Sequence, residues 1–182
     1  MALAGAAACF APVFAGCSEA PPLIPRGGWT VVFEDIPGCG PGAENQAVGI
    51  VDADARNELK EDGVDDVKVS CTVLDNGGSF EILAIEATKG LTLTLSIQEL
   101  KPGSTKDNPS IGSVSYASPN TAGPFTSAAC NFYFLEGTGQ GVKAGEVWLT
   151  FDCPEISIAI DNTCRIPIGY AAFENCKSTE DE

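Results

Sequence analysis

The sequence predicts an all-β fold, an antiparallel sandwich or barrel-like domain that carries one short helix and is cross-linked by disulfides. Three observations predict it. Runs in which apolar and polar residues alternate recur along most of the 182 residues. Between these runs lie 20 glycines and 12 prolines, and the chain holds 8 cysteines. Short strands separated by turn residues at fairly even spacing are typical of sandwiches and barrels.

The clearest strand signal is the segment 91–98, LTLTLSIQ, in which apolar and polar residues alternate strictly. Such alternation indicates one buried face and one solvated face. Residues 80–87 precede this strand and Lys89-Gly90 supplies a turn, so residues 79–98 are predicted to form a hairpin. Further strands are expected at 29–33, 67–74, 111–116, 128–135, 145–152, 155–160 and 166–173.

The one short helix is predicted at residues 54–62, with Asp52 or Asp54 as its cap and Gly63 as its end. The same stretch is rich in carboxylates, which are ligands that calcium prefers. The candidate calcium ligands are Asp52, Asp54, Glu58 and Asp62. The EF-hand pattern is not met, because Asn57 occupies the position that needs glycine. The favoured interpretation is therefore a solvated acidic loop without a metal.

The composition argues against several classes of function. Lys and Arg number 10 against 25 Asp and Glu, a formal net charge of −15, so we expect no nucleic-acid partner. The chain has no histidine, which removes His-based catalysis and the commonest zinc ligand. It also has no G-x-S-x-G motif. We expect no cofactor and no enzyme; a small hydrolase that acts through paired carboxylates is the remaining catalytic alternative.

The amino terminus resembles a bacterial lipoprotein signal. Residues 1–17, MALAGAAACFAPVFAGC, are uncharged and largely apolar, and they are too few to span a bilayer as a helix. Small residues precede Cys17 as in a lipobox, with Phe14 where leucine is usual. The resemblance implies cleavage before Cys17 and a diacylglycerol on its thiol. The alternatives are ordinary cleavage, which leaves Cys17 as a thiol or disulfide partner, and a buried strand at 1–17.

The chain is accordingly divided into four parts. These are a signal at 1–16, the lipidated Cys17 with a tether to residue 27, a single β domain at 28–176 and an acidic tail at 177–182. Eight cysteines beside one methionine indicate an oxidising compartment. By resemblance to bacterial sorting signals, Ser18 after the cysteine favours the outer membrane or the cell surface.

Six cysteines remain in the predicted domain, and an even number implies three bridges with fifteen connectivities. If residues 128–135 and 145–152 fold symmetrically about the glycine-rich segment 137–141, Phe132 lies opposite Phe151 and Cys130 lies opposite Cys153. The predicted bridges are Cys130–Cys153, Cys164–Cys176 and Cys39–Cys71.

Three aromatic residues, Trp29, Trp148 and Tyr116, are candidates for stacking on sugar rings. Trp148 has the opposite parity to Val147 and Leu149, so it is expected on the outer face of its strand. The favoured interpretation is that a loop or a second sheet covers it, since lone outward aromatics are often covered by neighbours.

The body also resembles the LpqH-type lipoprotein antigen family. The resembling segments are VSCT at 69–72, GTGQG at 137–141 and VWLTFDC at 147–153. The resemblance implies a single β domain on a lipid tether, a Cys71–Cys153 bridge and no catalysis. That pairing conflicts with the bridge expected within the hairpin.

Together these features predict a lipid-anchored protein of the bacterial cell envelope that acts by binding or by display. The membrane is its expected partner, and an envelope protein or a glycan is open as a second one. The alternatives are a calcium- or carbohydrate-binding extracellular module and the carboxylate-dependent hydrolase.

Overall fold

The computed structural model describes residues 23–37, 39, 44–159 and 162–178. In these residues every regular element is a strand. The strands are β1 (Arg26–Val32), β2 (Asn45–Val48), β3 (Ile50–Val51), β4 (Arg56–Asn57), β5 (Lys60–Glu61), β6 (Lys68–Asp75), β7 (Phe80–Thr88), β8 (Leu91–Leu100), β9 (Ser110–Ala117), β10 (Phe125–Tyr133), β11 (Gly141–Lys143), β12 (Glu146–Ala159) and β13 (Asn162–Glu174). The predicted all-β class is confirmed. The predictions for Cys17, its tether and the signal before it concern residues 1–22, which lie outside the described part of the chain.

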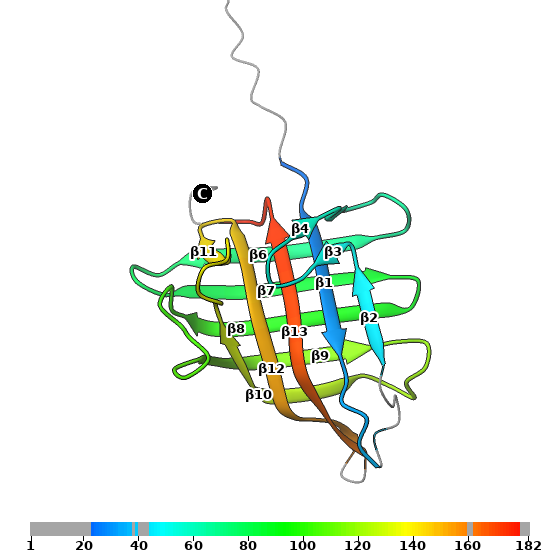
Figure 1. Cartoon of the computed structure of the whole chain (residues 1–182). Helices are drawn as coiled ribbons and strands as arrows, with labels where there is room; N and C mark the ends of the chain where they lie inside the picture. The colour runs from blue at the N-terminus through cyan, green and yellow to red at the C-terminus, as the bar shows by residue number, and fades with distance from the viewer. Residues whose placement is uncertain (1–22, 38, 40–43, 160–161, 179–182) are drawn as a thin grey trace, which may run out of the picture.

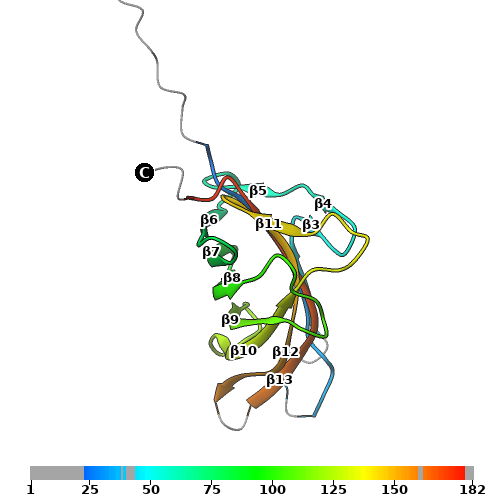
Figure 2. The same cartoon turned by 90° about the vertical axis from the view of Figure 1, so that its left-hand side faces the viewer.

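Nine of these strands form one antiparallel sheet in the order β2-β1-β13-β12-β10-β9-β8-β7-β6, and β5 and β11 attach to β1 and β12. The sheet curls into a half-barrel. Figure 1 shows β1, β12 and β13 crossing steeply over β6 to β9, and Figure 2 shows the two resulting layers edge-on. Such crossed layers bury the side chains that point between them.

The predicted hairpin at 79–98 is confirmed as β7 and β8, in which Thr88 pairs with Leu91. Lys89 and Gly90 both have positive φ, 46° and 84°, as a two-residue turn that matches strand twist requires. The strictly alternating residues of β8 place Leu93, Leu95 and Ile97 in the core. The separate strand predicted from residue 155 onward is not formed in the described residues, because β12 continues from Glu146 through irregular pairings to Ala159.

Side chains fill the space between the layers. Trp29 and Phe33 approach Tyr116 with ring centroids 6.0 and 5.0 Å away, and Phe33 lies 5.6 Å from Phe125. At the other side of the core Phe132 stacks on Phe151 at 5.8 Å. Trp29 and Tyr116, two of the three residues proposed for sugar stacking, are therefore core residues with no exposed surface.

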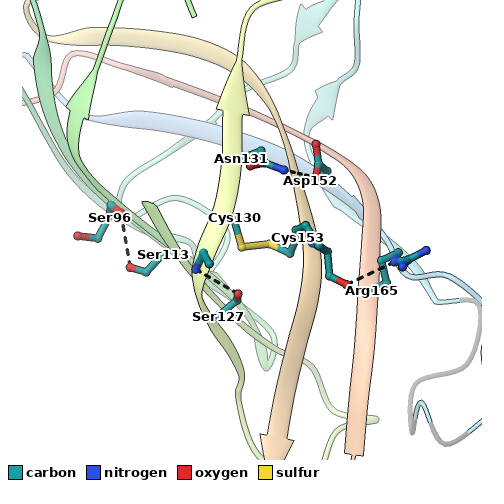
Figure 3. Close-up of a disulfide and its surroundings, with 10 residues drawn as sticks. Ser96, Ser113, Ser127, Cys130, Asn131, Asp152, Cys153 and Arg165 are labelled. Carbon is teal, nitrogen blue, oxygen red and sulfur yellow. Dashed lines mark hydrogen bonds between the residues drawn. A yellow bond between two sulfur atoms is a disulfide. The ribbon is translucent and has the colours of Figure 1, made fainter. Parts of the chain in front are cut away.

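The bridge predicted within the hairpin is present. Phe132 pairs with Phe151 in the register of β10 and β12, and Cys130 is bonded to Cys153 with Cα atoms 4.2 Å apart. Figure 3 shows this disulfide between the two strands, with the Asn131 amide donating to Asp152 beside it. A symmetric hairpin therefore accounts for both the register and the bridge.

The other two pairings predicted from the sequence are wrong. The structure bonds Cys39 to Cys164 and Cys71 to Cys176, not Cys39 to Cys71 or Cys164 to Cys176. The Cys71–Cys153 bridge implied by the family resemblance is absent as well, since both residues have other partners.

The physical reason is that strands far apart in the sequence pair with each other and that the sheet curls. The chain after β1 runs beside the start of β13, where the Glu34 amide donates to the Arg165 carbonyl at 3.0 Å, so Cys39 reaches Cys164. The segment after β13 meets the edge strand β6, where the Lys177 amide donates to the Cys71 carbonyl at 3.0 Å. The first bridge thus follows from the pairing of β1 with β13, and only the second depends on the curl that brings the end of the chain to β6.

The short helix predicted at 54–62 is also wrong. The chain there forms the β3–β4 hairpin, in which Ile50 pairs with Asn57, followed by β5 against β1. Asp52 caps a turn and not a helix, because its Oδ1 accepts from the amides of Asp54 and Ala55 at 2.8 and 2.7 Å. Aspartate makes the same local hydrogen bonds at a turn as at a helix start, so the sequence signal fits both.

Candidate functional site

Trp148 lies on the outer face of β12 but is only 5% exposed, because loops cover it. Its indole Nε1 donates to the Asp52 carbonyl at 3.3 Å, and the guanidinium carbon of Arg56 lies 5.5 Å from its ring. On another side the ring approaches Gly139 so closely that a Cβ there would lie 2.9 Å from a ring carbon. The prediction that neighbours cover Trp148 is confirmed, and this ring offers no stacking surface.

An ion-pair network fastens the β3–β4 hairpin over this tryptophan. Arg56 bonds to Glu146 and also reaches Glu174 at 3.2 Å, while Lys143 approaches Glu146 at 2.8 Å. Burial alone would raise the pKa of Glu146, but its hydrogen bonds with Lys143 and Arg56 and their charges lower it below its ordinary value. The cluster is thus a set of mutually satisfied charges that holds one structural element on another.

The four carboxylates proposed as calcium ligands are not gathered into a site. Asp52 caps its own turn, and Asp62 accepts from the Val69 amide at 2.9 Å. Asp54 lies near Tyr170, whose pKa is raised by burial and then by the charges of Asp52 and Asp54. Glu58 is exposed with a φ of 53°. No group of three or more potential metal ligands occurs within the described ranges.

The most unusual titratable group in the described part of the chain is Glu86 on β7. It is fully buried, and neither carboxyl oxygen has a hydrogen-bond partner among the described residues. Gly27 on β1 faces it, since a Cβ there would lie 2.9 Å from Glu86 Oε2. Burial raises the pKa of Glu86 to about 8, and the charge of Lys60 acts in the opposite direction. A large part of this carboxyl is therefore protonated at neutral pH.

Glu86 was not singled out from the sequence, although a signal was present. It has the same parity as Phe80, Ile82 and Ala84, which are all buried. The inward row that crosses the sheet runs through Val69, Glu86, Leu93, Tyr116 and Phe125. The alternation of inward and outward positions along β7 is thus enough to place Glu86 among apolar and aromatic core residues.

A shallow groove of about 610 Å³ lies close to this acid. It is lined by Ala47, Val48, Gly49, Lys60, Asp65, Asp66, Val67, Thr88, Lys89 and Leu91. Its charges are mixed, and Lys60 is the residue that both lines the groove and acts electrostatically on Glu86. Glu86 itself does not line the groove. The arrangement therefore does not present Glu86 to a molecule bound in the groove.

A second surface, in the middle of the outer side of β6 to β9, carries no charged side chain. We call it the neutral face; it consists of Ser70, Thr72, Leu83, Ile85, Ala87, Thr92, Thr94, Ser96, Ser113, Ser115 and Ala117. The strand registers align them in rows, in which Ile85 lies between Ser70 and Thr94, and Leu83 lies between Thr72 and Ser96. Leu83 and Ile85 are 48% and 37% exposed. The alternation in the sequence predicted a solvated face at the polar positions of β8, but it did not single this surface out as a site.

A search of protein-family models, curated proteins and solved structures finds no significant match to this chain. Among the residues that the structure describes, no helix is long and apolar enough to cross a membrane. The described residues thus define an all-β, disulfide-bonded domain. Three disulfides are typical of proteins outside the reducing cytosol, so the domain is extracytoplasmic.

Proposed function

We propose that this chain is a non-catalytic binding or display domain of the bacterial cell envelope, held at a membrane by lipid on Cys17. The observation that carries the extracytoplasmic part is the set of three disulfides among buried cysteines. The observation that supports the anchor is the small-residue run before Cys17 in an apolar amino terminus.

A binding role is favoured over catalysis by the placement of the acidic groups. A hydrolase that uses two carboxylates needs both to face the bond they cleave, about 5–10 Å apart. Glu86 is sealed between the layers, and Glu44, the other buried acid of the described chain, accepts from the Tyr116 hydroxyl at 3.1 Å. Neither of these buried acids lines the groove beside Lys60, and the two carboxylates that do, Asp65 and Asp66, are neighbours in the sequence and exposed to solvent.

The start of the described chain supports a short connection to the anchor. Leu23 and Ile24 are exposed, and β1 begins at Arg26. Residues 18–25 separate Cys17 from β1. A chain of n residues spans at most about 3.3–3.6 Å per residue, so a lipid on Cys17 would keep the start of β1 within roughly 30 Å of the membrane.

The anchor is tested by expressing the wild-type chain and Cys17→Ala in a bacterium that processes lipoproteins. We expect wild-type protein to incorporate labelled fatty acid and to partition into the detergent phase, and Cys17→Ala to do neither. Cys9→Ala is the matched control, since Cys9 lies within the expected signal, and it should behave as wild type. Equal partitioning of Cys17→Ala and wild type, or an unlabelled wild-type protein, would refute the anchor.

A further inference from the structure

We propose that the neutral face is a self-association surface, through which two copies of this chain pair about a two-fold axis. The proposal rests on the binding role proposed above and deepens it by naming the partner. It is supported by the chemistry of the face, its place on the sheet and the charge of the rest of the chain.

The distribution of charge favours pairing through this face. The chain carries a formal net charge of −15, yet all 11 residues of the neutral face are uncharged. The charged side chains that border the face lie at its margins: Lys68 at one end of β6, Lys177 beside Thr72 at the edge of β6, and Glu81 and Glu99 toward the open end of the hairpin. Two copies that meet through other, acidic surfaces would repel each other, whereas the neutral face places no like charges in contact.

The neutral face is also self-complementary. A two-fold interface brings the same patch of both subunits together, so the patch must suit its own chemistry. Seven of the 11 residues are serine or threonine, whose hydroxyls both donate and accept hydrogen bonds. Leu83 and Ile85 lie on neighbouring outward positions of β7 and supply the apolar centre. Such a patch matches itself, whereas a patch of one charge cannot.

The neutral face lacks aromatic side chains, which favours a second copy of the chain over a glycan as its partner. Flat sheet faces that bind sugars use aromatic rings as stacking platforms. The neutral face has no aromatic residue, and Trp29, Trp148 and Tyr116 are all buried elsewhere. A second copy is therefore the occupant that the chemistry of this face favours.

The strands beneath the face are regular enough to present a continuous surface. β6 pairs with β7 from Lys68 to Asp75 without a register shift, and β8 pairs with β9 equally regularly from Thr92 to Ser96. Standard protein interfaces use about 20–30 residues on each side, so a face of this size gives a weak dimer. Because the interface itself is neutral, screening of the surrounding negative charges by salt should strengthen it.

The test is sedimentation velocity of the full-length Cys17→Ser chain with its three disulfides formed, from about 10 to 500 µM, a range suited to a weak interface. This variant is not acylated, so failure here leaves the anchor experiment unaffected. We expect a concentration-dependent dimer whose association becomes tighter as salt is raised. A monomer throughout this range would overturn the proposal and leave the face to a different partner.

Two variants locate the interface. Leu83→Glu and, separately, Thr94→Glu should weaken dimerisation at least tenfold, because each buries paired negative charges at a two-fold contact. Ile50→Glu is the matched control, since Ile50 is 46% exposed against 48% for Leu83 and lies on β3, on the opposite side of the molecule (Figure 2). Cooperative thermal unfolding verifies that each variant is folded. A dimer that Ile50→Glu disrupts, or that neither face variant weakens, would place the interface elsewhere and overturn the proposal.

Discussion

Glu86 shows how a single residue makes this fold sensitive to pH. Its pKa is raised from 4.5 to about 8 by burial, so the folded state keeps a proton that the unfolded state releases. Its contribution to stability is therefore fully present below pH 4.5 and is lost as pH rises toward 8. At about 1.4 kcal/mol per pKa unit, the whole shift corresponds to up to ~5 kcal/mol.

The variant Glu86→Gln tests this directly, because glutamine has nearly the same size and cannot ionise. The free energy of unfolding of the wild type, relative to the variant, should fall by several kcal/mol as pH rises from 4 to 8. Urea unfolding at a series of pH values measures the difference, and other titrating groups cancel in the comparison. Parallel pH profiles for the two proteins would show that Glu86 is ionised in the folded state.

Trp148 carries a second prediction at the residue scale. Replacing it with alanine removes a ring held by Asp52, Arg56 and Gly139, and we expect a loss of about 3–5 kcal/mol in stability. Trp148→Phe keeps most of the ring but loses the indole hydrogen bond, and it should cost clearly less. Chemical denaturation of both variants measures the two losses. Equal, small losses would mean that the covering loops do not depend on this side chain.

At the scale of strands, the pairing of β12 with β13 depends on a glycine. Phe151 lies opposite Gly169, and a Cβ on that glycine would overlap the Phe151 ring. Gly169→Ala should therefore destabilise the fold by about 1–3 kcal/mol, because the ring cannot move away within a filled core. Gly141→Ala is the control, since a Cβ at that position would meet no atom of the described residues within 4 Å; it should change stability by less than ~0.5 kcal/mol. Similar unfolding midpoints for both variants would contradict the close packing.

Elements that are specified by residues close together in the sequence could be predicted from it. The turn Lys89-Gly90 and the alternation of β8 specify their hairpin within about 20 residues, and the symmetric hairpin gave Cys130–Cys153. The segment after Asp52 was misread because aspartate serves a turn and a helix start by the same hydrogen bonds. The inward position of Glu86 could also be predicted from its parity with the apolar residues of β7, but the alternation of apolar residues does not by itself mark an acid as buried.

Contacts between segments far apart in the chain could not be predicted from the sequence. Cys39 and Cys164 are 125 residues apart, and Cys71 and Cys176 are 105 apart. The first pair meets because β1 and β13, far apart in the sequence, are neighbours in the sheet. The second pair meets because the sheet curls until the segment after β13 reaches β6. No single segment encodes that curl, which accumulates from the twist of successive strand pairs.

At the scale of the whole molecule, the bridges should differ in how much they stabilise the fold. In the chain-entropy model a loop of about 100 residues contributes roughly 4.7 kcal/mol and one of about 23 residues roughly 3.4 kcal/mol. The double variant Cys71→Ala/Cys176→Ala should therefore lose more stability than Cys130→Ala/Cys153→Ala, whose hairpin already holds its ends together. Denaturant midpoints of the two variants make the comparison. The reverse order would show that the curled sheet closes without help from its bridge.

The central claim is that this chain folds outside the cytosol into a half-barrel closed by three specific disulfides. Peptide mapping of the exported protein, digested without reduction after free thiols are blocked, tests it most directly. We predict peptides that link Cys39 to Cys164, Cys71 to Cys176 and Cys130 to Cys153. Blocked free thiols at these six positions, or a different set of linked peptides, would contradict it.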